Sequence, residues 1–328
     1  MNRKEFFRNN IPNDISVFHK PFWLDFVCGE NWDICLEFDS ENEIVAYMPF
    51  YFEKKNGLYK IKMPKLTPFL GPVVLSEKKG IYQKNSSDND LVNSLFAQIP
   101  EWIDYNVNWH FGSQNLLLPI AQKPNFFLKP KYTYFVNSSI SAESFYSEIK
   151  LKQRNSIKSA KKSFKLSESF EPAKLYYLVE RTYSRQNSKA SFSKTFFLEL
   201  CNSIRKNNAG FILFCLDKED VLIAGGLFVT DSKNTYYLVG GVDLDKPSQG
   251  TMAFLIWSAI EKSLTENRNF DFEGSILPGV ENFFRSFGSE RRLFFTVIGA
   301  NKTARVFFED GLRSIKSSLK LLITKWNQ

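Results

Sequence analysis

An internal repeat constrains the fold of this chain more than any single motif does. Residues 35–59 align without a gap on residues 213–237, with seven identities in 25 positions, among them Asp39 with Asp217. Each copy has an apolar run, a short acidic turn, a second apolar run, a Lys-Asn turn and an aromatic run, a pattern typical of strands joined by tight turns. We therefore predict a similar antiparallel three-stranded meander in each half of the chain.

The second half continues in an order that indicates the class of fold. After the meander strand at 235–242 come a loop, a helix, a strand, a short helix and a final strand, at 243–249, 252–265, 269–275, 279–288 and 291–300. Ser248 is placed to cap the longer helix, and Gly288 to stop the shorter one. A helix between two strands of one sheet requires a parallel crossover. We predict a mixed α/β (α+β) fold, built twice.

The length of the chain favours two domains, because 328 residues are many for one hydrophobic core. We place the first domain at 1–140, a basic connecting helix at 141–168 and the second domain at 169–328. Hydrophobic residues make up 43% and charged residues 24% of the chain, as in soluble globular proteins. The charged N-terminus lacks a signal-peptide core, and the most apolar runs are about half as long as a membrane span, so we expect a cytoplasmic protein.

The cysteines and histidines exclude two kinds of site. The four cysteines form no CxxC pair, and only two histidines accompany them: Cys28, Cys35, Cys201, Cys215, His19 and His110. A structural zinc site and a nucleophilic triad with a histidine base both lack their parts. We expect reduced thiols that serve as small apolar side chains, and no metal.

Three segments carry a resemblance to a known family. They are WDICLEF…EIVAYMPFYF…KIKMPKLTPFLGPVV (32–74), KQRNSIKSAKKSF (152–164) and FDFEGSILPGVENFFRSFG (270–288). The second resembles an Arg-x-x-Ile-x-x-Ala-x-Lys segment, and the third an Asp-Phe-x-Gly strand end followed by a Phe-x-x-Phe-Gly helix. In these motifs the chain is similar to the FemAB-like group of the GNAT acyltransferase superfamily, whose members have two tandem GNAT domains.

The resemblance implies transfer of an acyl or aminoacyl group to an amine. The donor would be acyl-CoA, as in ordinary GNAT enzymes, or aminoacyl-tRNA, as in the Fem-type branch, where the acceptor is a peptidoglycan precursor. Neither a tightly bound cofactor nor a metal is implied, and no DNA partner. A fold alone does not settle an activity. The alternative is a catalytically silent binding protein with this fold, for an anionic or lipid-linked ligand.

The residues that would hold the donor depart from the GNAT pattern. The resemblance places Tyr236, Tyr237 and Gly240 along the donor channel and Ser248, Gln249, Gly250 and Thr251 at its phosphate end. Ordinary GNAT enzymes need small residues there, so that backbone N–H groups can approach a pyrophosphate. Here Met252 and Phe254 occupy the two small positions of the pattern. Either the pyrophosphate binds differently or CoA is not the donor, and Ser248 as a simple helix cap is the alternative.

The helix after the acidic strand also departs from the pattern. Many GNAT enzymes have a tyrosine acid four residues before the helix-ending glycine, and this chain has Phe284, which has no proton to give. Arg285 follows, where the Fem-type pattern commonly has lysine. Arg285 is a candidate for stabilising an oxyanion or binding a phosphate, and a surface salt bridge is the alternative.

Two carboxylates mark the candidate catalytic strand end. In NFDFEGS, strand alternation puts Phe270 and Phe272 on one face and Asp271 and Glu273 on the other. Amine attack on an activated carbonyl needs orientation and a base for one proton. We predict Glu273 as that base and Asp271 as its support. The alternative is that both acids bind backbone amides or the nearby Arg291 and Arg292.

Two basic amphipathic segments are candidate partner surfaces. Lysines and arginines at 150–165 would form one helical stripe, opposite an apolar stripe that includes Ile157. The predicted stripe suits tRNA, a diphosphate-bearing precursor or an anionic membrane, with Arg154 and Lys158 holding the anion. A solvated face is the alternative. The C-terminal segment 312–326 has a similar pattern and predicts docking across the domain boundary or peripheral membrane contact.

Overall fold

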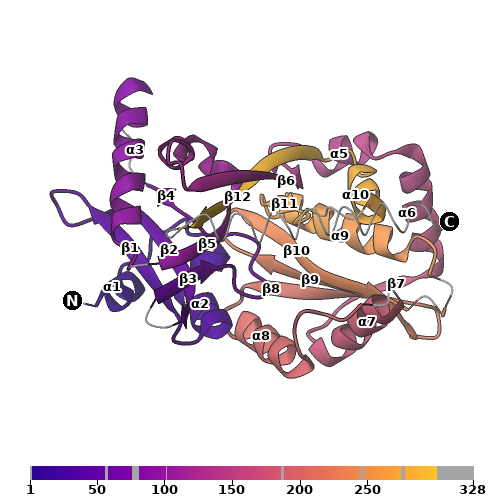
Figure 1. Ribbon diagram of the computed structural model, residues 1–328. Helices are drawn as coiled ribbons and strands as arrows, with labels where there is room; N and C mark the ends of the chain where they lie inside the picture. The colour runs from indigo at the N-terminus through magenta and orange to yellow at the C-terminus, as the bar shows by residue number, and fades with distance from the viewer. Residues whose placement is uncertain are drawn as a thin grey trace, which may run out of the picture.

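The computed structural model describes residues 2–55, 58–75, 81–100, 102–185, 188–243, 245–246, 248–274 and 278–300. The elements of the N-terminal half, with η for a 3-10 helix, are α1 (Arg3–Asn9), η1 (Val17–His19), α2 (Pro21–Cys28), β1 (Trp32–Phe38), β2 (Ile44–Lys55), β3 (Leu58–Lys62), β4 (Val73–Val74), α3 (Ile81–Ala97), β5 (Trp102–Trp109), η2 (Phe111–Leu116), α4 (Leu118–Ala121) and β6 (Phe126–Val136) (Figure 1). Those of the C-terminal half are α5 (Ala142–Glu148), α6 (Leu151–Ser163), β7 (Lys165–Glu168), α7 (Pro172–Arg185), α8 (Lys194–Lys206), β8 (Gly210–Leu216), β9 (Leu222–Thr230), β10 (Asn234–Val242), α9 (Thr251–Thr265), β11 (Asn269–Asp271), α10 (Pro278–Arg285) and β12 (Glu290–Ala300).

The repeat forms the two meanders that the sequence predicts. Strands β1, β2 and β3 pair antiparallel in chain order, and so do β8, β9 and β10. Asp39 and Asp217 each accept two backbone N–H groups of their own turn, at 2.8–3.0 Å. Asn42 and Asp220, at equivalent positions of the two turns, both have a left-handed backbone, with φ of 63° and 61°. The two copies therefore share the turn as well as the strand order.

Each meander continues through a helix into a parallel strand, which confirms the mixed α/β class. Strand β5 pairs parallel with β3, and β11 pairs parallel with β10. The predicted helix is α9, which is buried on most of its circumference. Its N-cap is Gly250, in the left-handed region at φ 81°, rather than the predicted Ser248. Strand β11 ends at Asp271, four residues earlier than predicted.

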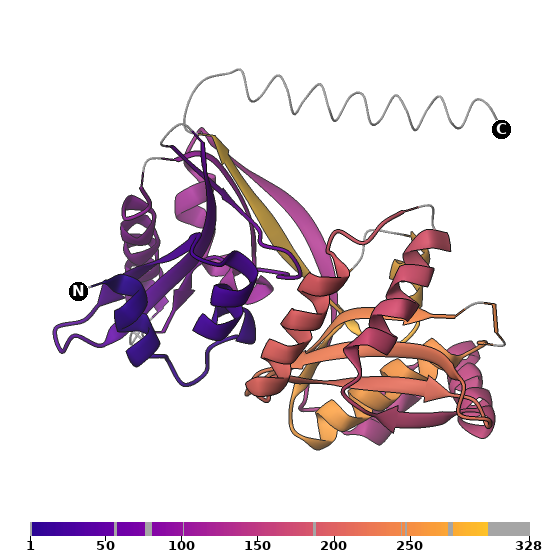
Figure 2. The same ribbon diagram turned by 90° about the horizontal axis from the view of Figure 1, so that it is seen from below.

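The last strand joins the two halves. The described strands form one 12-stranded sheet in the order β1-β2-β3-β5-β12-β6-β11-β10-β9-β8-β7, with β4 beside β2. β12 pairs antiparallel with both β5 and β6, and β6 reaches β11. In Figure 2 the long β6 and β12 ribbons run between the two lobes. Side chains from β6 therefore reach the end of β11.

The predicted connecting helix is two helices, α5 and α6, followed by strand β7. The chain is extended at Ile149, and the N–H of Lys150 donates to the carbonyl of Ser286 at 3.0 Å, so the helix cannot continue across this point. Ile157 and Ala160 of α6 are buried against α9, as the apolar stripe predicts. A division into domains at 140 and 168 stays a prediction.

Two cores sandwich the C-terminal part of the sheet. Helices α5, α6, α9 and α10 contribute to the core on one face, and α7 and α8 to the core on the other. The second core also contains Val17, Phe18, Trp23 and Phe69 from the N-terminal half. The lobes therefore share buried apolar side chains in addition to the bridging strands. The predicted amphipathic segment at 312–326 lies outside the described residues. Among the residues described, none of the helices is both long and apolar enough to span a bilayer.

Candidate functional site

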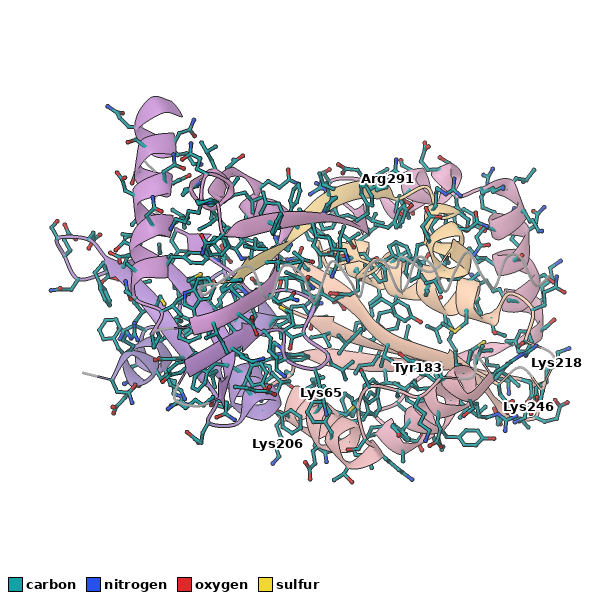
Figure 3. The ribbon with its side chains drawn as sticks, in the orientation of Figure 1. Lys65, Tyr183, Lys206, Lys218, Lys246 and Arg291 are labelled. Atoms are coloured by element: carbon teal, nitrogen blue, oxygen red, sulfur yellow. The ribbon has the colours of Figure 1, made fainter. Side chains whose placement is uncertain are left out.

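The sheet opens where β10 and β11 separate. These strands pair over three residue pairs only, from Asn234 with Asn269 to Tyr236 with Asp271. β10 then bulges between Tyr237 and Val239 and continues beside β9 only, without β11. Between the separated strands lies a cavity of about 650 Å³. Its walls come from β10, α10, α7 and the 66–68 loop, and Tyr183 of α7, labelled in Figure 3, is among them.

Of the three residues predicted along a donor channel, Tyr237 and Gly240 line this cavity and Tyr236 does not. Tyr236 points to the other face of the sheet, where it packs on Phe18 and donates its hydroxyl to Asp231 at 3.1 Å. Alternation along β10 explains the difference, because neighbouring side chains lie on opposite faces.

Gly240 is required by the position of Tyr237. A Cβ at residue 240 would lie 2.1 Å from the Tyr237 hydroxyl oxygen. We expect Gly240→Ala to push the Tyr237 ring out of place, to destabilise the protein by about 1–3 kcal/mol, and to weaken binding in the cavity. Gly279→Ala is the matched control, because Gly279 lines the same cavity and its Cβ would meet nothing within 4 Å. Urea unfolding checks the prediction, and equal stability of the two variants would contradict it.

The predicted phosphate end lies outside the cavity. None of Ser248, Gln249, Gly250 and Thr251 is among the described residues that line it, whereas Met252 is. Thr251 is fully buried and donates its hydroxyl to the Ser248 carbonyl at 2.7 Å. A Cβ on Gly250 would lie 2.7 Å from the carbonyl oxygen of Ser156 in α6. A backbone carbonyl therefore lies close to the N-terminus of α9, where a pyrophosphate would need room.

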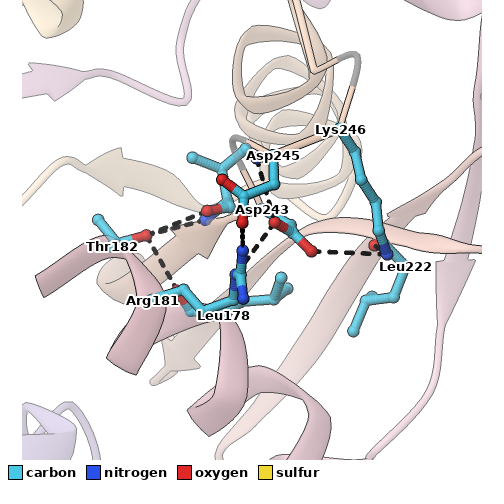
Figure 4. A network of polar contacts seen from close by, with 8 residues as sticks. Leu178, Arg181, Thr182, Leu222, Asp243, Asp245 and Lys246 are labelled. Carbon is cyan, nitrogen blue, oxygen red and sulfur yellow. Dashed lines mark hydrogen bonds and ion pairs between the residues drawn. The ribbon is translucent and has the colours of Figure 1, made fainter. Parts of the chain in front are cut away.

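The loop between β10 and α9 is anchored to α7. Arg181 Nε lies 3.0 Å from Oδ1 of the buried Asp243, and Lys246 Nζ lies 3.5 Å from its Oδ2 (Figure 4). Thr182 Oγ1 accepts the N–H of Val242 at 3.0 Å. These contacts fix the end of β10, so the opening between β10 and β11 is part of the folded framework.

A second cavity, of about 340 Å³, lies on the other side of the end of β11. It is lined by Pro68, Phe69, Asn108, His110, Phe111, Lys131, Tyr132, Thr133, Asp271, Glu273, Gly274 and Phe294. Pro68, Glu273 and Gly274 also line the larger cavity. The predicted base therefore stands at the boundary between two cavities.

The backbone turns sharply at Glu273. Both Glu273 and Gly274 are left-handed, with φ of 61° and 55°. A Cβ on Gly274 would lie 2.1 Å from the carbonyl oxygen of Tyr132, so only glycine fits there. This turn ends β11 early. A left-handed glutamate is a strained conformation of the kind that gathers at functional sites.

Asp271 orders this turn. It is 4% exposed and accepts hydrogen bonds from the Thr133 hydroxyl and, at 2.9 Å, from the N–H of Glu273. The predicted alternative is thus correct in part, since Asp271 binds a backbone amide. Arg291 stacks on Tyr132 and Arg292 on Phe135, and neither forms an ion pair with these acids.

The two carboxyl groups hold their protons more tightly than usual. Burial raises the pKa of Glu273 well above its usual range, and the charge of Asp271 raises it further. Oε1 of Glu273 is buried without a hydrogen-bond partner. Burial also raises the pKa of Asp271 to about 6, against the opposing effects of the Thr133 hydroxyl, the Glu273 N–H and Arg292. Such paired, perturbed acids are typical of catalytic sites.

The structure does not bring the remaining predicted residues to this point. Arg285 is exposed and pairs with Glu281 of its own helix at 3.3 Å, so the salt-bridge alternative holds for it. Arg154 and Lys158 lie on α6; the Nε of Arg154 is buried without a partner, and Lys158 is exposed. In the described part of the chain, no group of three or more His, Cys, Asp or Glu side chains is arranged to hold a metal ion.

Sequence reasoning missed Thr133 and Lys131, both from β6. The signal is weak but present: in the segment KPKYTYF the polar residues at 129, 131 and 133 share one face of an otherwise aromatic strand. Nothing in the segment indicates that this face meets the end of β11, because that contact depends on how β6 and β12 cross between the lobes.

Comparison with known proteins identifies the fold. No family model matches the chain, and no curated protein matches it in sequence. The crystal structure of FemX is similar, with a TM-score of 0.62 at 10% identity over 89% of this chain and 94% of that one. The structure of L-PGS from Bacillus licheniformis has a TM-score of 0.52 at 10% identity over 93% of each chain. A conserved protein of unknown function from Bacteroides thetaiotaomicron has a TM-score of 0.52 at 10% identity over 85% of this chain and 88% of that one. The chain therefore shares the fold of FemX and L-PGS over most of its length, as the FemAB-like resemblance of its motifs predicted.

Proposed function

We propose that this protein is a cytoplasmic N-acyltransferase of the FemAB-like type, which transfers an acyl or aminoacyl group from an activated donor to an amine. The observation that carries the proposal is the position of Glu273. This half-buried glutamate has a carboxyl group of raised pKa and a strained backbone. It borders both cavities at the point where the sheet opens. A donor in the larger cavity and an acceptor in the smaller one would meet beside it.

The chemistry requires little more than this arrangement. The amine nitrogen forms a bond to the donor carbonyl carbon, and the bond from that carbon to the leaving oxygen or sulfur breaks. Glu273 accepts the proton that the nitrogen loses. Because its pKa is raised, Glu273 then returns the proton to the leaving atom more readily than an ordinary carboxyl, and this replaces the acid that Phe284 cannot supply. Asp271 positions Glu273 by accepting a hydrogen bond from the backbone N–H of Glu273.

We propose aminoacyl-tRNA rather than acyl-CoA as the donor. The packing of Gly250 against the Ser156 carbonyl supports this choice, since it disfavours a pyrophosphate at the N-terminus of α9. Basic side chains of α6 supply a second argument. They are exposed and form no ion pair within the described part of the chain: Lys152, Lys158, Lys161 and Lys162. Such a surface suits a phosphate backbone, and peripheral contact with an anionic membrane is its other use. A cell-wall precursor with a free amine is the proposed acceptor.

Turnover and binding assays test the donor. We expect multiple-turnover transfer from aminoacyl-tRNA to an amine, and no thermal stabilisation by acetyl-CoA. A bound donor at about 100 times its dissociation constant would add roughly 2.7 kcal/mol, which is easily measured. Binding of tRNA should weaken with salt, and Lys158→Ala with Lys162→Ala should reduce the salt slope by about one per lost phosphate contact.

Lys206→Ala is the control for these lysine variants, because Lys206 is exposed on α8, at the other face of the sheet (Figure 3). Saturable stabilisation by acetyl-CoA with turnover would overturn the choice of donor and leave the acyltransferase. Binding of an anionic or lipid-linked ligand without turnover from either donor would favour the catalytically silent alternative.

A further inference from the structure

The smaller cavity is lined by side chains of opposite charge. Asp271 and Glu273 line it, and so does Lys131. Lys131 is the single lysine or arginine among the described residues of this lining. Aromatic side chains from Phe69, Phe111 and Phe294 contribute to the same lining. A ligand that fills this space can meet a cation, apolar rings and two acids.

Lys131 is held in place without a counter-ion. Its Nζ donates to Oδ1 of Asn108 at 3.0 Å. Asn108 is itself fixed, because its Nδ2 donates to the Pro68 carbonyl at 2.9 Å and its Oδ1 also accepts the Thr296 hydroxyl at 2.8 Å. Lys131 forms no ion pair with any described carboxylate. The ammonium thus points into the cavity from a rigid support with its charge uncompensated.

Burial gives this ammonium a reason to bind an anion. Lys131 is half-buried, and its desolvation, together with the charge of Lys129, lowers its pKa. An anionic group at Nζ would offset both effects, and a charged hydrogen bond is stronger than a neutral one. No such gain exists for Lys129, whose side chain is exposed on the same strand.

The spacing between Lys131 and the two acids follows from β6. Lys131 and Thr133 are two residues apart and share one face of this strand, so their Cα atoms lie about 7 Å apart. Thr133 donates to Asp271, which in turn accepts the N–H of Glu273. The cation is therefore a short spacer away from the proposed base.

We propose that the acceptor is an amine that also carries an anionic group, separated by a short apolar spacer, and that Lys131 binds this group. The inference rests on the proposed function, since it places the acceptor amine at Glu273. A carboxylate or a phosphate would serve at Lys131. Recognition of the anion orients the amine toward the carbonyl in the larger cavity, so Lys131 is a positioning residue.

Calorimetry with amines of matched length tests this inference without any donor. The probes are β-alanine, γ-aminobutyrate and ε-aminocaproate, each compared with its uncharged amide. We expect saturable binding of at least one amino acid, and binding of its amide about 10- to 100-fold weaker, the size of a lost charged hydrogen bond. Lys131→Met should remove the difference between acid and amide, and Lys131→Arg should retain part of it.

Lys129→Met is the matched control and should keep the full preference for the acid. Equal binding of acid and amide by the wild type, no saturable binding of any probe, or an undiminished preference in Lys131→Met would each overturn the inference. With turnover, Lys131→Met should raise KM for the anionic acceptor and leave kcat within a few fold. A protein that binds the probes through Lys131 but transfers nothing would contradict the proposed function alone.

Discussion

Glu273→Gln is expected to reduce turnover by about 100- to 10,000-fold, the usual contribution of a positioned general base. Glutamine keeps the size and one acceptor oxygen of the side chain but cannot accept the amine proton. The variant should still bind donor and acceptor, because the cavities and the turn at Gly274 are unchanged. Steady-state kinetics therefore should show a lower kcat with little change in KM.

Stability separates this loss from misfolding. Burial and Asp271 raise the pKa of Glu273, which means that the folded state disfavours its ionised form. A neutral glutamine removes that penalty, so the variant should be at least as stable as the wild type at neutral pH. Glu261→Gln, at an exposed position of α9, makes the same chemical change away from the site and should leave the rate unchanged.

The pH profile provides an independent measurement. The base must lose its proton to act, so the wild-type rate should rise with pH through the raised pKa of Glu273. If the acceptor amine has a low pKa, it does not titrate in the range measured, and the profile then reports a group of the enzyme. Glu273→Gln should lack this rising limb. Full wild-type rate in the variant would remove Glu273 from the mechanism.

The sequence predicts the parts of this fold that depend on local pattern. The meanders follow from strand and turn signals that Asp39 and Asp217 carry, and α9 follows from helical spacing of apolar residues. The local pattern does not predict that α6 approaches α9. This approach places the Ser156 carbonyl beside Gly250, and a contact between distant segments leaves no trace in the local pattern.

The sequence indicated the two acids of the candidate site but not the residues that surround them. Strand alternation would continue through Glu273, yet the chain turns left-handed there, and Gly274 permits the turn where the Tyr132 carbonyl approaches. Whether a strand ends at the glycine that follows it depends on what packs against that glycine. Lys131 and Thr133 were missed for the same reason, because β6 meets β11 only through a sheet that spans both lobes.

Asp271→Asn is expected to increase the free energy of unfolding, relative to wild type, more at neutral pH than at acid pH. The pKa of Asp271 is raised in the folded state to about 6, and in the unfolded chain it is about 3.9. The folded state therefore binds this proton more tightly. Stability from this group is fully present below pH ~4 and declines until the pH passes ~6, by about 3 kcal/mol in total. Asparagine does not titrate, so the variant lacks this decline.

The measurement is the difference between variant and wild type in free energy of unfolding, from urea curves at several pH values. Carboxylates that do not interact with Asp271 titrate alike in both proteins and cancel in the difference. Relative to wild type, the variant should gain about 3 kcal/mol between pH ~4 and pH ~7. Loss of the Asp271 charge also lowers the pKa of Glu273, which adds to the gain.

Thr133→Val serves as the matched variant, because it keeps Asp271 but removes the hydroxyl that donates to it. That hydrogen bond lowers the pKa of Asp271, so its loss should raise the pKa further and steepen the decline of stability with pH. Opposite changes in slope from two substitutions that meet at one oxygen atom would locate the effect at Asp271. Parallel curves for all three proteins would mean that Asp271 titrates normally, and that its burial does not raise its pKa.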